Sequence, residues 1–245
     1  MFKNRSTEKE LLDDVTHNHK DLIRNLHEIE FTNRWFGSSH TFISSLDRIH
    51  KKNPEYFKNR TIDIVDLGCG GGDLLRLAQA WTRTKKINAN LLGLDVNPYI
   101  VQQAQSLSTH FPSIEYQQLD IFSDDFKKLH FDIVTLNSVC HHMTDEELIN
   151  LLQQLQTQTK VAIVINDLQR HWLPYLGIKL VSKLLNFSSY GQQDGPISVL
   201  RGFQKKDLLQ IMHNAKNYDL RWTWAFRWQV IIWCEPFKNI KGRLN

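Results

Sequence analysis

The chain has 245 residues, of which 41% are hydrophobic and 23% are charged. These values are ordinary for a globular protein, and they exclude a disordered, collagenous or disulfide-scaffold chain. The 30 Lys and Arg residues against 26 Asp and Glu give a net charge of +4. Because both signs are interleaved along the chain, this charge does not favour a dedicated nucleic-acid-binding protein.

The three cysteines, Cys69, Cys140 and Cys234, lack the close spacing of a metal site or a redox pair. The first residues are polar and lack the apolar segment of a secretory signal. No apolar run reaches the ~18 residues that a transmembrane helix needs. These features predict a cytoplasmic protein with reduced cysteines.

Residues 1–60 are predicted to form a helical N-terminal cap. Thr7 to Glu10 has the pattern of a capping box that opens a helix. Apolar residues then recur at helical spacing through Leu22 to Ile29 and through Phe42 to Ile49. Asn53-Pro54 marks a break after these helices.

Short β-branched runs alternate with helical patterns from residue 61 onward. The expected strands are residues 61–67, 91–95, 113–119, 131–137 and 161–165, followed by two closing strands at 222–226 and 229–234. This alternation predicts a doubly wound, mostly parallel, seven-stranded sheet that binds ligands at the carboxyl ends of its strands. Residues 61–245 are therefore predicted to be one α/β, Rossmann-like domain. Residues 171–203 interrupt the alternation and are expected to be an inserted cap with a turn at 191–195.

A glycine-rich loop follows the first expected strand. Gly68, Gly70 and Gly72 lie between this strand and a helical pattern, which is the context of a ligand-binding loop. The dinucleotide fingerprint G-x-G-x-x-G is not met, because Asp73 occupies the position of its third glycine. This disfavours a dehydrogenase, and the loop alone is also compatible with a plain tight turn.

Acidic residues at the ends of three successive strands strengthen the ligand-binding interpretation. Asp66 precedes the loop, Asp95 ends the second expected strand and Asp120 ends the third. In doubly wound sheets, an acid at the position of Asp95 accepts hydrogen bonds from both hydroxyls of a ribose. Asp120 is placed to accept a hydrogen bond from an adenine amino group. The glycine-rich loop and the three acids together predict a cofactor that contains adenosine.

These residues resemble the motifs of class I S-adenosylmethionine-dependent methyltransferases of the small-molecule type. Ile64 to Gly72 is similar to the first motif of that family, Asp95 to its ribose-binding acid, and Asp120-Ile121 to its adenine-pocket pair. Phe131 through His142 resembles the motif of the fourth strand. The resemblance is best over about residues 61–168.

The resemblance implies S-adenosylmethionine as cofactor and S-adenosylhomocysteine as product. The cofactor-binding residues that it implies are Asp66, Gly68, Gly70, Gly72, Asp95, Val96, Asp120, Ile121, Asn137 and Ser138. Arg34 lies in a segment similar to the N-terminal lid of such enzymes and is a candidate to bind the cofactor carboxylate. A surface charge is the alternative for Arg34.

Two histidines follow the fourth strand and would face the methyl group of such a cofactor. The reference pKa of histidine, ~6.5, suits proton removal near neutrality. A phenol or enol must lose its proton to accept a methyl group, so His142 is the first candidate for a catalytic base and His141 the second. The alternatives are that one histidine packs while the other caps the next helix, or that an acidic phenol needs no base.

The candidate substrate-binding residues lie where the fifth strand enters the inserted cap: Asn166, Asp167, Arg170 and Trp172. The Asn-Asp order differs from the magnesium-binding constellation of catechol methyltransferases, so no metal is expected. The cap is apolar nearly all round. It could pack on the N-terminal helices, enclose an aromatic or polyketide-like substrate, or contact a membrane surface that carries a lipidic quinone.

Nucleic-acid methyltransferases carry proline-containing signatures at the fourth strand, and Asn137 to Cys140 has none. The sequence therefore predicts methyl transfer to a small, largely apolar acceptor, preferably O-methylation of a phenolic or polyketide-like compound of secondary metabolism. C-methylation of a quinone precursor is the nearest alternative. A non-catalytic, partner-binding protein with the same fold is the alternative from another class.

Overall fold

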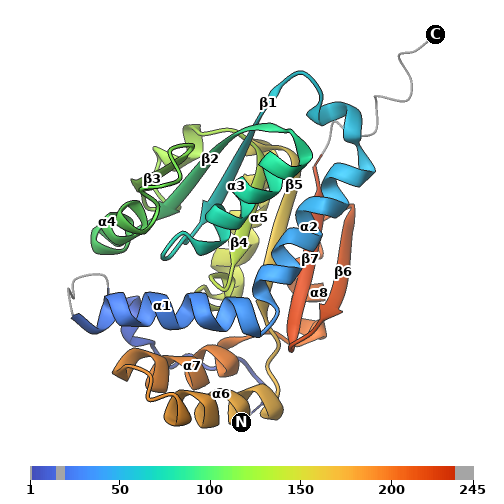
Figure 1. The fold of residues 1–245 in the computed structure, drawn as a ribbon. Coiled ribbons are helices and arrows are strands. Elements are labelled where there is room, and N and C mark those ends of the chain that lie inside the picture. Colours follow the sequence, from blue (N-terminus) through green and yellow to red (C-terminus); the bar gives the residue numbers. More distant parts are fainter. Residues whose placement is uncertain (1, 15–19, 235–245) are drawn as a thin grey trace.

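A computed structural model describes residues 2–14 and 20–234 (Figure 1). Its strands are β1 Thr61–Leu67, β2 Asn88–Asp95, β3 Ile114–Gln118, β4 Phe131–Asn137, β5 Thr159–Leu168, β6 Tyr218–Thr223 and β7 Arg227–Trp233. Its α-helices are α1 Lys20–Trp35, α2 Ser38–Lys52, α3 Asp73–Lys85, α4 Pro98–Leu107, α5 Asp145–Gln158, α6 Trp172–Leu184, α7 Ser189–Arg201 and α8 Lys205–Ile211. Its short 3₁₀ helices are η1 Leu11–Asp13, η2 Pro54–Phe57, η3 Phe126–Lys128 and η4 Cys140–His142.

The seven strands form one sheet in the order β3-β2-β1-β4-β5-β7-β6. Strands β1 to β5 are parallel, and β7 is antiparallel to both β5 and β6. The predicted Rossmann-like fold class is therefore confirmed. The chain leaves β1 toward β2 on one side and returns to β4 on the other, so the ligand-binding edge lies at the carboxyl ends of β1 and β4.

Helices cover both faces of the sheet and bury its central strands. One apolar cluster joins the sheet to α2, α3 and α4 through residues such as Phe42, Leu75 and Ala104. A second cluster joins the opposite face to α5 and α8 through Leu151 and Leu208. Because β4 is buried along its whole length, the side chains just beyond its end are held on a rigid support.

The N-terminal segment differs from the prediction. No helix begins at Thr7; Glu10 and Asp13 instead cap η1 reciprocally. Of the apolar residues Leu11, Leu12 and Val15 that would follow the capping box in the predicted helix, Val15 falls outside the described residues. The backbone N–H of Ser6 donates to the Leu200 carbonyl at 3.0 Å. The local capping pattern therefore does not determine the structure here, because a long-range pairing places residues 2–14 against α7.

The inserted segment is a helical pair, α6 and α7, that lies beneath α1 (Figure 1). The predicted turn at 191–195 is wrong, because Gly191 and Gly195 both lie within α7. A Cβ at Gly191 would come within 2.5 Å of Glu28 Oε2 of α1. These glycines therefore serve close helix packing rather than chain reversal.

The first closing strand begins four residues earlier than predicted, and the second begins two residues earlier. Trp224 to Phe226 form the connection between β6 and β7 instead of a strand. Among the described residues, no helix combines the length and the hydropathy that would be needed to cross a bilayer.

Candidate active site

A cavity of about 1450 Å³ opens at the carboxyl ends of the strands. Its walls come from the glycine loop, η4, the helices α1, α6 and α7, and the N-terminal residues up to Asp13. The apolar part of the wall consists chiefly of Leu26, Ile29, Phe36, Ile100, Val139, Ile178, Phe187, Tyr190 and Val199. The cavity thus has one polar end against the sheet and one apolar end against the helices.

The glycine loop presents its backbone to this cavity. Gly68, Gly70 and Gly72 have φ angles of +68°, +52° and +74°, which favour glycine. A Cβ at Gly72 would lie 2.1 Å from the Tyr116 hydroxyl, whereas a Cβ at Gly70 would meet open space. The loop is therefore shaped by tight packing on one side and is open to the cavity at Gly70.

Asp66 lies at the base of the cavity and is almost fully buried. Its Oδ1 accepts hydrogen bonds from Thr135 Oγ1 at 2.6 Å and Asn137 Nδ2 at 2.9 Å. Burial, with smaller contributions from Asp73 and Asp95, raises the pKa of Asp66 to about 7 against the lowering effect of these two donors. The carboxyl group is fixed in position and close to its titration point at neutrality.

Asp95 joins the end of β2 to the glycine loop. Its two oxygens accept from the backbone N–H groups of Asn97 at 3.0 Å and Gly70 at 3.4 Å. Burial raises its pKa, against the effect of these N–H groups and of the His142 charge. Asp95 lines the cavity together with Val96, as expected.

The remaining residues of the predicted cofactor site also line the cavity: Asp120, Ile121, Asn137 and Ser138. Asp120 lies two residues beyond β3 and accepts from the Phe122 N–H at 2.9 Å. Ser138 has φ of +51° and receives a hydrogen bond from Arg227 Nη1 at 2.9 Å. The strand-end residues that the sequence predicts for the cofactor site therefore lie together in the cavity.

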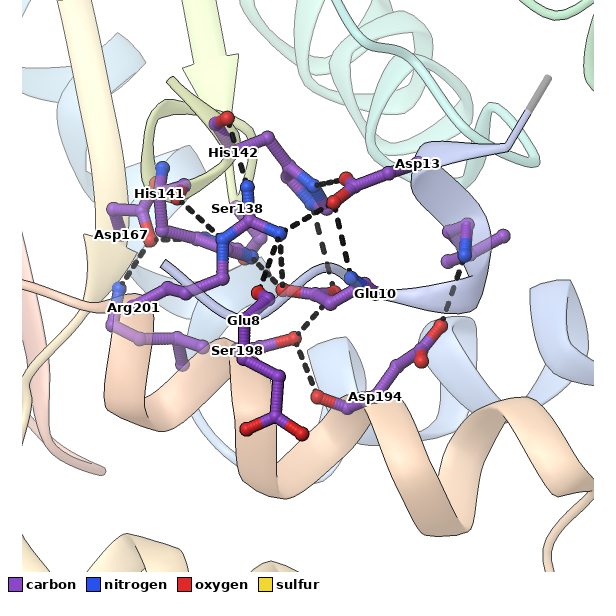
Figure 2. Close-up of polar contacts among 12 residues, drawn as sticks. Glu8, Glu10, Asp13, Ser138, His141, His142, Asp167, Asp194, Ser198 and Arg201 are labelled. Carbon is purple, nitrogen blue, oxygen red and sulfur yellow. Dashed lines mark hydrogen bonds and ion pairs between the residues drawn. The ribbon is translucent and has the colours of Figure 1, made fainter. Parts of the chain in front are cut away.

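The two histidines lie side by side in η4, each with a carboxylate partner (Figure 2). His141 Nδ1 lies 2.7 Å from Asp167 Oδ1, and His142 Nδ1 lies 2.6 Å from Asp13 Oδ1. Burial alone would raise the pKa of both acids, but the histidine contacts hold each pKa below its usual value. Ionised carboxylates only accept hydrogen bonds, so each Nδ1 carries the proton and each Nε2 is the reactive nitrogen.

Glu10 faces both reactive nitrogens (Figure 2). Its Oε1 lies 3.7 Å from His141 Nε2, and its Oε2 lies 3.8 Å from His142 Nε2. Oε2 also accepts from Ser198 Oγ at 2.8 Å, whereas Oε1 has no hydrogen-bond partner. Burial raises the pKa of Glu10 to about 7, against the charges of His142 and Arg201. A group that titrates near neutrality thus lies next to two imidazoles.

Glu10, His141 and His142 could hold a metal ion, since their ligand atoms lie within 4.8 Å of one another. However, Arg201 Nη1 lies 3.7 Å from Glu10 Oε1 and 2.6 Å from Asp13 Oδ2. This guanidinium already supplies a positive charge to the cluster. The arrangement therefore favours proton transfer over binding of a cation.

Sequence reasoning missed most of this cluster. Glu10, Asp13 and Arg5 come from the N-terminal segment, and Ser198 and Arg201 from α7. Arg5 donates to the carbonyls of residues 141 and 143, and Arg201 to those of residues 141 and 142, so the two guanidinium groups anchor the loop that carries the histidines. The only sequence signal was the unusual density of acids at Glu10 to Asp14.

Comparisons with known proteins identify the domain. A family model described as "methyltransferase domain" matches residues 64–161, which include the glycine loop, Asp95 and the histidine pair. This part of the chain is a methyltransferase domain. The resemblance to class I S-adenosylmethionine-dependent methyltransferases is thereby confirmed. No curated protein matches the sequence significantly.

Solved structures of methyltransferases are similar in fold to this chain. Human N-acetylserotonin methyltransferase, in complex with SAM, has a TM-score of 0.62 at 15% identity, with 92% of this chain and 59% of that one covered. The plantazolicin methyltransferase BpumL, in complex with SAH, has a TM-score of 0.57 at 15% identity, covering 87% and 95%. The bifunctional kinase-methyltransferase WbdD has a TM-score of 0.51 at 15% identity, covering 78% and 38%, so the chain spans about two fifths of WbdD.

The predicted substrate residues of the methyltransferase do not line the cavity. Asn166 is buried and donates to Ser38, and Asp167 is the buried partner of His141. Arg170 is buried as well, where it donates to the carbonyl of Phe2 at 3.0 Å. For Asn166 and Asp167 the expectation failed because β5 continues to Leu168, which holds both side chains beneath the site instead of in it.

Two further predicted residues point away from the cavity. Trp172 begins α6 and is half exposed. Arg34 is exposed beside Trp35, outside the lining residues. Its neighbour Asn33 does line the cavity, and donates to Asp73 Oδ2 at 3.0 Å. The helical phase of α1 therefore turns Asn33 toward the cavity and leaves Arg34 outside it.

Proposed function

We propose that this methyltransferase transfers the methyl group of S-adenosylmethionine to a small, largely apolar acceptor, preferably the oxygen of a phenolic or polyketide-like compound. The observation that carries the proposal is a single cavity that contains the glycine loop and Asp95 at one end and the histidine pair beside an apolar wall. The named complexes of N-acetylserotonin methyltransferase with SAM and of BpumL with SAH support the choice of cofactor. We infer a cytoplasmic location, to which the three buried, unpaired cysteines are suited.

The residues that line the polar end fit this cofactor. Asp95 would accept hydrogen bonds from the ribose, and Asp120 with Ile121 would flank the adenine. The open space at Gly70 leaves the loop backbone accessible. The buried Asp66 would offer a carboxyl group to the cationic amino-acid end of the cofactor. When bound, S-adenosylmethionine supplies an electrophilic methyl group.

The apolar end fits an acceptor with aromatic or aliphatic surface. Methyl transfer is an in-line displacement, so holding the acceptor in position supplies much of the acceleration. His142 is the more accessible of the two histidines, at 26% side-chain exposure against 3% for His141. With its Nδ1 proton directed to Asp13, His142 has Nε2 free to take the proton of an acceptor hydroxyl. His141 is the second candidate for the same role.

Cofactor binding tests the proposal most directly. Calorimetry should detect binding of S-adenosylhomocysteine and no binding of NAD. In Asp95→Ala the ribose acceptor is lost, and hydrogen bonds to a charged group contribute about 1.5–3 kcal/mol each, so affinity should fall at least tenfold. Asp124→Ala, which removes an exposed acid that pairs with Lys127, is the matched control and should bind like the wild type. Unchanged affinity in Asp95→Ala would remove this residue from the site.

A further inference from the structure

Helix α6 exposes an apolar stripe along its outer face. Its members recur every four residues and are therefore aligned on one side of the helix: Trp172, Leu176, Leu180 and Leu184. The three leucines are 53%, 60% and 73% exposed. Ser182 is the one buried residue of α6, although this helix is strongly apolar. Among residues 2–14 and 20–234, nothing covers the stripe, and such surfaces mark sites of interaction.

The charge around the stripe is positive. Lys179 and Lys183 lie one position before Leu180 and Leu184 and are both exposed. The sequence contains no Asp or Glu between Asp167 and Asp194. An apolar helical face with flanking lysines and no acids complements a surface that is apolar inside and anionic at its edge. This combination is the signature of helices that lie in the interface of an anionic membrane.

Aromatic side chains lie next to the start of α6. His171 contacts the rings of Trp172 and Phe226, at centroid distances of 5.7 and 5.3 Å. Phe226 in turn contacts Trp224 at 5.9 Å, and Trp224 is largely exposed. Tryptophan is favoured at the boundary between apolar and polar layers of a bilayer. Trp224 and Phe226 also line the cavity, so this aromatic group lies at the edge of the cavity beside the start of α6.

The other side of α6 belongs to the methyltransferase cavity. Leu173, Pro174, Gly177 and Ile178 line it. Helix α6 lies at the far end of the molecule from the sheet, with the cavity between them (Figure 1). The helix is therefore a thin wall between the acceptor site and the outside.

We propose that the outer face of α6 docks on an anionic lipid surface and that the acceptor is lipid-soluble and enters from that surface. The second half rests on the proposed methyltransferase function, whereas the docking itself does not. A symmetric dimer through α6 would bring together two copies of a face that carries Lys179 and Lys183 and no acid, so like charges would repel and disfavour a second copy of the chain as the partner. The anionic headgroups of a bilayer instead neutralise both lysines.

Flotation with lipid vesicles tests the docking. The full chain should bind vesicles of phosphatidylcholine with about 30% phosphatidylglycerol more strongly than vesicles of phosphatidylcholine alone. Leu176→Ser/Leu180→Ser/Leu184→Ser should weaken binding to the anionic vesicles at least about tenfold, because the apolar area that would be buried is lost. Lys179→Glu/Lys183→Glu should weaken it by at least about tenfold as well, and more at low than at high salt.

Leu209→Ser is the matched control, since Leu209 is an exposed leucine on α8 that does not line the cavity. It should bind vesicles like the wild type. Wild-type protein that does not float with anionic vesicles would overturn the docking, as would an α6-dependent dimer in sedimentation without lipid binding. Calorimetry with S-adenosylhomocysteine separates the two proposals: vesicle binding without nucleoside binding would leave the docking standing and remove the methyltransferase function.

Discussion

Replacement of His142 by alanine is expected to slow methyl transfer by roughly 10²–10⁴-fold, the usual effect of losing a general base. The ionised Asp13 holds the Nδ1 proton of His142, so Nε2 is the atom that would take the acceptor proton. The affinity for S-adenosylhomocysteine should change little, because His142 lies on the acceptor side of the cavity. Single-turnover transfer of a labelled methyl group to a phenolic acceptor measures the chemical step.

His142→Asn separates the base from the structural contact. The asparagine amide can still donate to Asp13 but has no equivalent of Nε2, so it should be as slow as alanine. Both variants should regain rate as the pH rises toward the phenol pKa of ~10, since the phenolate needs no base. His141→Ala is the internal comparison. If the rate of methyl transfer falls strongly in this variant alone, His141 and not His142 is the base. Losses of only a few-fold in both would leave positioning as the source of acceleration.

The cofactor side of the site could be predicted because its determinants are local in sequence. A strand, the Gly68–Gly72 loop and a helix are consecutive, and parallel strands necessarily bring Asp95 and Asp120 to the same edge. Each of these positions depends on backbone conformation and strand order rather than on packing between distant segments. Gly68, Gly70, Asp95 and Asp120 therefore line one cavity, as pattern and topology predict, whereas Gly72 packs against Tyr116 and does not line it.

The acceptor side could not be predicted because it is assembled from segments far apart in the chain. Arg5 reaches the carbonyl of His141 across 136 positions, and Arg201 reaches it from the other direction. The density of acids at Glu10 to Asp14 marks the segment but not the role of Glu10, which has the pattern of an ordinary helix-capping acid when a helix is expected at Thr7. Likewise, the length of β5 decided that Asp167 supports His141 instead of meeting substrate.

Glu10→Gln is expected to make the protein more stable than the wild type at pH 8 but not at pH 4.5. Burial raises the pKa of Glu10 from 4.5 to about 7 in the folded state, so folding favours the protonated carboxyl. The stability that Glu10 contributes is fully present below its unfolded pKa and is lost as the pH rises through about 7. At 1.36 kcal/mol per pKa unit, this loss is about 3 kcal/mol. Glutamine cannot ionise, so the Glu10→Gln variant does not undergo this loss of stability.

The free energy of unfolding from urea titrations at several pH values measures this difference. Asp66, whose pKa is also raised to about 7, titrates in both proteins, so its contribution cancels when the variant is compared with the wild type. Glu146→Gln, which removes an exposed carboxylate in the first turn of α5, is the control and should give a curve parallel to the wild type. If the Glu10→Gln curve is also parallel, Glu10 is ionised in the fold throughout this range. It could then not exchange protons with the imidazoles of His141 and His142, and the cluster would act through fixed charges alone.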